Sequence, residues 1–116
     1  MSGFHEINEE MSRLTREIET LSGQLEDKRT AYEQEKHAFE LTHSRFIMSG
    51  KIEHSEWTQT DLMAYATQQA SEAKIKMILA NGTYRKLRAE LNAKQDRLDT
   101  VKEQGWNLRQ ELKRLN

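Results

Sequence analysis

The fold of this chain is set by residues 63–115, which read MAYATQQASEAKIKMILANGTYRKLRAELNAKQDRLDTVKEQGWNLRQELKRL. Mostly apolar residues follow one another here at alternating gaps of three and four, without a break in phase: Met63, Ala66, Ala70, Ala73, Met77, Ala80, Tyr84, Leu87, Leu91, Lys94, Leu98, Val101, Gly105, Leu108, Leu112 and Leu115. This spacing is typical of the buried seam of a coiled-coil helix. Because such a seam must be buried against another helix, the upstream residues are expected to supply that helix and a turn.

A second seam of the same kind begins near the N-terminus. It comprises Phe4, Ile7, Met11, Leu14, Ile18, Leu21, Leu25, Lys28, Tyr32, Glu35, Phe39, Thr42 and Phe46. The two seams predict an all-α protein, a long antiparallel two-helix coiled-coil hairpin forming a single domain over residues 1–116. The first helix is expected over about residues 4–48, the turn over about 49–57 and the second helix over about 58–116.

Capping residues mark the expected turn. Ser49 and Gly50 are expected to end the first helix, since glycine tolerates the left-handed conformation of a C-cap. Thr58 precedes Asp61 at the spacing of a capping box, although Thr60 is an equally good N-cap. Asn81-Gly82 is the one candidate break inside the second helix. Because the hydrophobic phase continues across it, a continuous helix is favoured over a three-helix bundle.

The charge distribution favours folding back. Acidic residues outnumber basic ones over residues 1–61, and basic residues outnumber acidic ones over residues 74–116, so the two halves attract each other. A register that places large side chains against small ones fills a narrow core without voids. The predicted pairs are Met48 with Trp57, Tyr32 with Ala73, Phe39 with Ala66, Ile7 with Leu98 and Glu10 with Arg97. In this register residues 105–116 extend beyond the first helix without a partner.

Composition limits the class of protein. The chain has 116 residues, of which 35% are hydrophobic and 32% charged, with no proline, and this profile favours continuous helix over a thick globular core. The absence of cysteine excludes disulfides and cysteine-based metal or redox chemistry. No apolar run has the length of a membrane span, and the first residues lack the features of a signal peptide. A cytoplasmic protein without membrane contacts is therefore expected.

A second apolar edge is expected beside the seams, close to the turn. It consists of Ala31, Ala38, Leu41, Met48, Leu62, Tyr65 and Leu79. Such an edge usually marks an interface, and the simplest partner is a second copy of the chain. We therefore predict a homodimer that forms a local four-helix bundle through these residues.

The sequence predicts no catalytic, cofactor or metal site. Glu40 and His43 have the spacing found in di-iron bundles, but both fall outside the seam and the pair occurs once. The C-terminal residues Trp106, Leu108, Leu112 and Leu115 are predicted to contact an unknown protein partner. The preferred function is a non-enzymatic structural, adaptor or assembly module that acts through protein–protein contacts. The alternative is a small nucleic-acid-binding accessory protein using the basic second helix, which a net charge of −1 and the lack of interleaved aromatics make less favourable.

Overall fold

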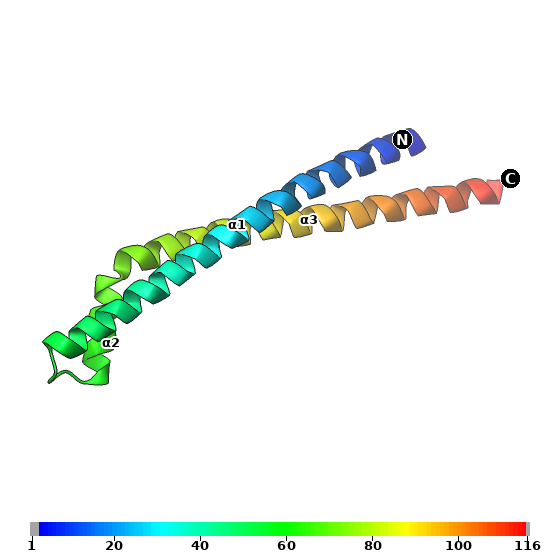
Figure 1. The fold of residues 1–116 in the computed structure, drawn as a ribbon. Coiled ribbons are helices and arrows are strands. Elements are labelled where there is room, and N and C mark those ends of the chain that lie inside the picture. The colour runs from blue at the N-terminus through cyan, green and yellow to red at the C-terminus, as the bar shows by residue number, and fades with distance from the viewer. Residues whose placement is uncertain (1–2, 116) are drawn as a thin grey trace. The chain divides into compact units, whose positions relative to one another are not determined.

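The computed structural model describes residues 3–115, and its regular structure there is α-helical, so the predicted all-α class is confirmed. The helices are α1 (Phe4–Glu53), α2 (Gln59–Gln69) and α3 (Ser71–Leu115) (Figure 1). The chain divides into two compact units. Unit 1 combines Met1–Glu26 with Lys86–Asn116, and unit 2 is Asp27–Arg85. Both α1 and α3 contribute to each unit, whereas α2 belongs to unit 2.

In unit 1 the first turns of α1 pack antiparallel against the last turns of α3. The core is formed by Ile7, Leu14 and Val101, with Met11, Leu98 and Leu108 packed around them. A Cβ atom placed on the buried Gly105 would lie 3.4 Å from Ile7 Cγ2. Ile7 therefore faces Gly105, one heptad beyond the predicted partner Leu98. In this register Leu108 packs within unit 1, so the prediction that it has no intramolecular partner is wrong.

In unit 2 the last turns of α1 pack against α2 through a buried glycine. A Cβ atom on Gly50 would lie 2.9 Å from Leu62 Cδ2, so glycine permits the two helices to approach closely. Gly50 has a negative φ and lies inside α1, which continues to Glu53. The predicted C-cap at Gly50 and the predicted end of the first helix near Met48 are therefore wrong.

The aromatic pairs of unit 2 also differ from the predicted register. Tyr32 stacks on Tyr84, with ring centroids 6.4 Å apart, where the predicted register paired Tyr32 with Ala73. Phe46 meets Tyr65 edge to face at 6.0 Å. Size complementarity alone therefore selected the wrong one of two seam-matched registers. The close packing of Gly50 against Leu62 fits the observed register, because α1 continues to Glu53 through residues that were expected to form the turn.

The predicted capping box at the start of α2 is confirmed. The Asp61 N–H donates to Thr58 Oγ1 at 3.2 Å, and the Thr58 N–H donates to Asp61 Oδ2 at 3.0 Å. Residues 54–58 form the loop before this box. Within the loop, His54 stacks on Trp57 with ring centroids 3.8 Å apart, and Trp57 meets the Tyr65 ring at 5.2 Å. These contacts hold Trp57 against its own unit.

The second helix is interrupted at Ala70, which the sequence did not predict. Ala70 has φ −92° and ψ 12°, yet the hydrogen bonds from the Ala70 N–H to Ala66 O and from the Lys74 N–H to Ala70 O are both present. The interruption changes the direction of the chain between α2 and α3 (Figure 1). In α2, Leu62 is buried, at 5% exposure, and the predicted seam residue Met63 is 41% exposed, whereas the predicted seam residues Ala66 and Ala70 are buried. Residues 81 and 82, the one break considered from the sequence, lie inside α3.

Candidate functional site

An exposed aliphatic face lies on the part of α3 that belongs to unit 2. Ile75, Ile78 and Leu79 are all more than half exposed. Their spacing places them on one face of the helix, away from the half-buried seam residues. On the same helical projection, Lys74 and Arg85 flank this face on one side and Lys76 flanks it on the other. We call these residues the α3 patch: Lys74, Ile75, Lys76, Ile78, Leu79 and Arg85.

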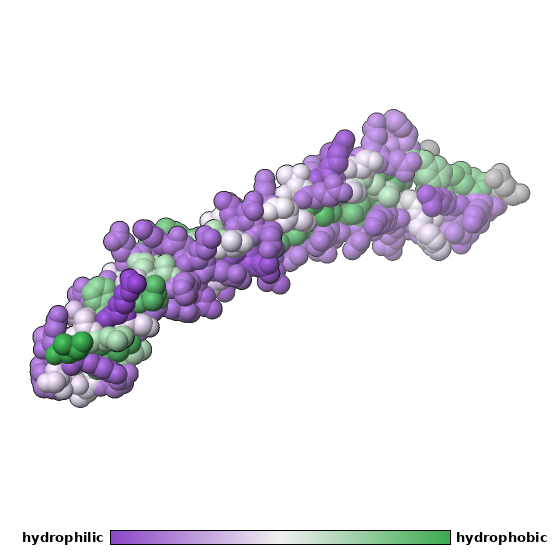
Figure 2. All heavy atoms as spheres, in the orientation of Figure 1, coloured by the Kyte–Doolittle hydropathy of each residue, from purple (hydrophilic) through white to green (hydrophobic). Residues whose placement is uncertain are grey.

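A second exposed apolar group lies around the loop of unit 2. Ile52 is 81% exposed at the end of α1, and Met63 is exposed on α2. The exposed charged side chains near them are Lys51, Glu53, Glu56 and Asp61. Figure 2 shows apolar side chains over the end of α1 and beside the first turns of α3. We call the group around the loop the turn patch: Ile52, Glu53, Glu56, Asp61 and Met63.

The residues predicted to form a dimer interface divide into two groups. Leu62 and Tyr65 lie within unit 2, where Leu62 contacts Gly50 and Tyr65 contacts aromatic rings, so they do not form the outward-facing edge that was predicted. Ala31 is half-buried. The remaining predicted residues are exposed: Ala38, Leu41, Met48 and Leu79.

Three exposed isoleucines and one exposed methionine are not among the predicted interface residues: Ile52, Met63, Ile75 and Ile78. The exposed residues of α3 could have been predicted from the sequence, because Ile75, Ile78 and Leu79 have the spacing of a helical face opposite the seam. Met63 could not be found, since the predicted continuous helix placed it in the seam. The surface of unit 2 is therefore more apolar than the sequence prediction allowed.

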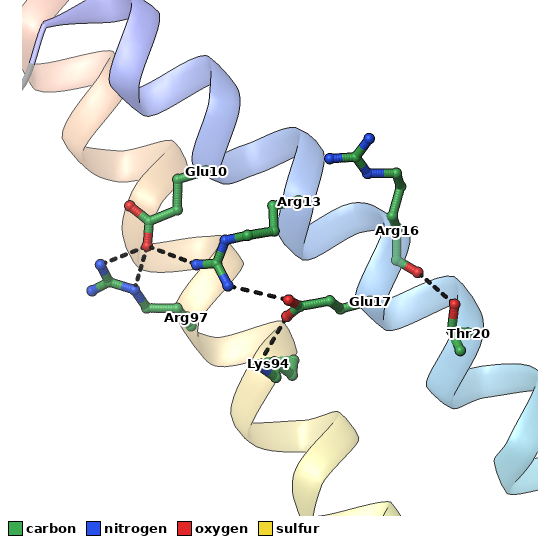
Figure 3. A network of polar contacts seen from close by, with 7 residues as sticks. All are labelled: Glu10, Arg13, Arg16, Glu17, Thr20, Lys94 and Arg97. Atoms are coloured by element: carbon green, nitrogen blue, oxygen red, sulfur yellow. Dashed lines mark hydrogen bonds and ion pairs between the residues drawn. The ribbon is translucent and has the colours of Figure 1, made fainter.

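In unit 1 a network of charged side chains links α1 to α3 (Figure 3). Arg97 donates from Nε and Nη2 to Glu10 Oε1 at 3.0 and 2.7 Å, which confirms the predicted proximity of these two residues. Lys94 Nζ lies 2.8 Å from Glu17 Oε2. Arg13 lies between the two acids, 3.8 Å from Glu10 and 3.1 Å from Glu17. The network links the two helices within unit 1.

The network makes the stability of unit 1 depend on pH. The contact with Lys94, followed by the charges of Lys94 and Arg13, lowers the pKa of Glu17 below its ordinary value of 4.5, against partial desolvation that raises it. A lowered pKa in the folded state stabilises the protein above the unfolded pKa, and this contribution is lost as pH falls through the folded pKa. We expect the free energy of unfolding to decrease below about pH 4.5, and Glu17→Gln to reduce that decrease, as measured by urea unfolding at several pH values.

Lys94→Gln should reduce the same pH dependence, because it removes the largest cause of the shift. The double variant should do little more than either single change, since both remove one interaction. A Glu17→Gln protein with the full pH dependence of the original chain would contradict this assignment.

Three of the four predicted partner-binding residues at the end of α3 are exposed, and the fourth is packed. Leu108 packs against the core of unit 1. Trp106, Leu112 and Leu115 are exposed. Exposed tryptophan and leucine side chains can contact another protein, because they bury large apolar areas.

Metal-ligating side chains are not clustered among the described residues. Over residues 3–115, no cluster of three or more His, Asp or Glu side chains is placed to hold a metal ion. His43 belongs to the Glu40 and His43 pair noted in the sequence. Its Nε2 atom lies 3.3 Å from Thr67 Oγ1, across the contact between α1 and α2. No helix within residues 3–115 combines the length and the apolar character that crossing a bilayer requires.

Comparison of the chain with protein-family models, with curated proteins and with solved structures finds no match. A functional assignment therefore depends on the chemistry of the chain's own surface. On that surface, the largest concentration of exposed apolar side chains is in unit 2.

Proposed function

We propose that this protein is a non-enzymatic helical module that acts through protein–protein contacts and that it forms a homodimer through unit 2. The observation that carries the proposal is the number of large aliphatic side chains left exposed on this small unit: Leu41, Met48, Ile52, Met63, Ile75, Ile78 and Leu79. Exposed apolar surface of this extent usually marks an interaction site. Burying it against a second copy would gain about 25 cal/mol for each Å² of apolar area removed from water.

In this proposal the chain is an antiparallel two-helix coiled coil in the cytoplasm, and two copies form a four-helix bundle near the turn. Support comes from the antiparallel contacts found within each unit, such as Glu10 with Arg97 and His43 with Thr67. The exposed Trp106, Leu112 and Leu115 then provide a separate surface for another protein.

The alternative, nucleic-acid binding by basic residues of α3, has less support. Lys94 and Arg97 form ion pairs with Glu17 and Glu10, so two of the candidate phosphate contacts are already engaged within unit 1. A titration with random-sequence DNA at increasing salt tests this alternative, because phosphate binding must weaken steeply with salt.

Sedimentation equilibrium tests the proposed dimer. We expect a mass of twice 13.7 kDa at micromolar concentration. Ile78→Asp should shift the equilibrium towards monomer by about 10-fold or more in Kd, because it would bury a charge in the interface. Leu115→Asp, an equally polar change at an exposed site of unit 1, is the matched control and should leave the mass unchanged. A purely monomeric original chain at about 100 µM would overturn the proposal.

A further inference from the structure

The helix α1 carries a second line of residues at heptad spacing, beside the seam that packs within unit 2. The gaps along this line alternate between three and four, so its members lie on one face of the helix. All of them are exposed except the half-buried Ala31, and the large apolar members are Leu41, Met48 and Ile52. In the described part of the chain, α1 therefore has one packed line and one line that faces outward. We call the outward line the α1 face: Ala31, Gln34, Ala38, Leu41, Arg45, Met48 and Ile52.

A groove of about 300 Å³ opens beside Ala38. Its lining includes small side chains from both sides, Ala38 and Thr42 from α1 and Ala70 and Ala73 from the later part of unit 2. Because these side chains are short, they leave a hollow that a longer apolar side chain from outside can enter. Insertion of one side chain between the residues of a facing helix is the contact from which coiled coils are built.

The α1 face matches itself when two copies of it run antiparallel. In one heptad register, Leu41 of each copy faces Ala38 of the other, where the groove lies. In the same register Met48 faces Ala31, so each of these large apolar side chains meets a small one, and such a contact fills without voids. The match is reciprocal, as a two-fold axis requires.

The polar residues of the α1 face select the same register. Gln34 faces Arg45, whose guanidinium can donate a hydrogen bond to the Gln34 side-chain oxygen. A shift of one heptad in one direction would place Arg45 against Leu41, and a shift in the other direction would place Met48 against Gln24. Either shift therefore sets a large apolar side chain against a polar one.

The charges beside the α1 face also favour this contact. Glu35 is next to Gln34, so it brings a carboxylate close to Arg45 of the other copy. The closest pairs at the edges of the contact bring no like charges together: Lys28 with Ser49, Thr30 with Lys51, Glu35 with Thr42 and His37 with Ser44. The α1 face therefore fits a second copy of itself in size, polarity and charge.

We propose that a second copy of this chain covers the α1 face, with the two α1 helices antiparallel about a two-fold axis and Leu41 of each copy in the groove beside Ala38 of the other. The inference goes beyond the proposed dimer, because Ile78, whose substitution tests that dimer, lies on α3 and outside the α1 face. A chain with two separate self-associating surfaces assembles beyond the dimer at high concentration.

Sedimentation equilibrium of the Ile78→Asp chain isolates the α1 contact from the proposed dimer. At about 500 µM this chain should still reach a mass of twice 13.7 kDa, whereas the original chain should exceed that mass. Adding Leu41→Asp should raise the Kd of the Ile78→Asp dimer at least about 10-fold, because a carboxylate would be buried against Ala38. Gln24→Asp adds the same charge at an exposed site of α1 in unit 1 and is the matched control.

The two proposals fail in different ways in this experiment. An Ile78→Asp chain that is monomeric at about 500 µM, beside an original chain that is dimeric, would overturn the α1 contact and leave the proposed dimer intact. An original chain that is monomeric at the same concentration would overturn both.

Cross-linking tests the antiparallel register and leaves the charges unchanged. The chain has no cysteine, so Ala31→Cys and Met48→Cys chains each carry one thiol. A short bismaleimide should link the two kinds of chain when they are mixed. Met48→Cys chains alone should not be linked, because position 48 of one copy lies about 25 Å along the helix from position 48 of the other. Linking of Met48→Cys chains to one another, or no linking in the mixture, would overturn the arrangement.

Discussion

Leu14→Ala is expected to lower the free energy of unfolding of unit 1 by about 2–4 kcal/mol. Leu14 is 1% exposed and belongs to the core with Ile7 and Val101. Removing three side-chain carbons leaves a cavity that two packed helices cannot fully close, and the core is too small to distribute the loss. Urea unfolding followed by Trp106 fluorescence measures the effect, because Trp106 is the tryptophan of unit 1.

Leu115→Ala is the matched control for this prediction. Leu115 is 82% exposed on α3, so the same truncation should change the free energy of unfolding by less than about 0.5 kcal/mol. Equal losses in the two variants would show that Leu14 does not belong to a packed core.

Gly50→Leu is expected to destabilise unit 2 by about 1–3 kcal/mol, through overpacking between α1 and α2. A Cβ atom at this position lies 2.9 Å from Leu62 Cδ2 and 3.4 Å from Tyr65 Cδ1, and the rest of a leucine side chain needs more space than those contacts leave. The better helix propensity of leucine, about 0.8 kcal/mol over glycine, offsets only part of the cost. Trp57 fluorescence reports the change, since Trp57 contacts Tyr65.

Gly23→Leu is the control, because Gly23 lies in the same helix and a Cβ atom there meets nothing within 4 Å. This variant should gain up to about 0.8 kcal/mol from propensity alone. A stabilised Gly50→Leu protein would contradict the close contact between α1 and α2.

Features that depend on local spacing could be predicted from the sequence. The alternating gaps of three and four identified the core residues Ile7, Leu14 and Val101, and hydroxyl and carboxylate spacing identified the capping box of Thr58 and Asp61. The exposed positions of Leu41 and Met48 also followed from the helical phase. Each of these inferences uses neighbours within one helix.

The register could not be predicted, because it depends on a contact between helices. Glycine at position 50 fits a helix C-cap as well as a close helix contact, and the sequence contains nothing that separates the two roles. Choosing the C-cap shortened α1 and favoured a register in which Ile7 faced Leu98 and not Gly105. The interruption at Ala70 was equally hidden, since no glycine or proline marks it and the hydrophobic phase continues on both sides.

The candidate interaction surface was partly missed for the same reason. Leu62 is buried and Met63 is exposed, the reverse of the prediction, although the seam residues Ala66 and Ala70 of the same segment are buried as predicted. Periodicity over a longer stretch does not detect such a change at the start of a short helix. The exchange moves Leu62 out of the predicted dimer interface and adds Met63 to the exposed surface.

The short loop at residues 54–58 has a consequence for the order of folding. In unit 2, contacts such as His43 with Thr67 join residues 24 apart in the chain, whereas Glu10 and Arg97 in unit 1 are 87 apart. Closing a short stretch of chain costs less entropy, and local contacts form faster. Unit 2 should therefore nucleate first, and the two helices should then join progressively towards the chain termini. On unfolding, the sequence of events reverses, so amide hydrogens in unit 1 should exchange with solvent before those around the loop.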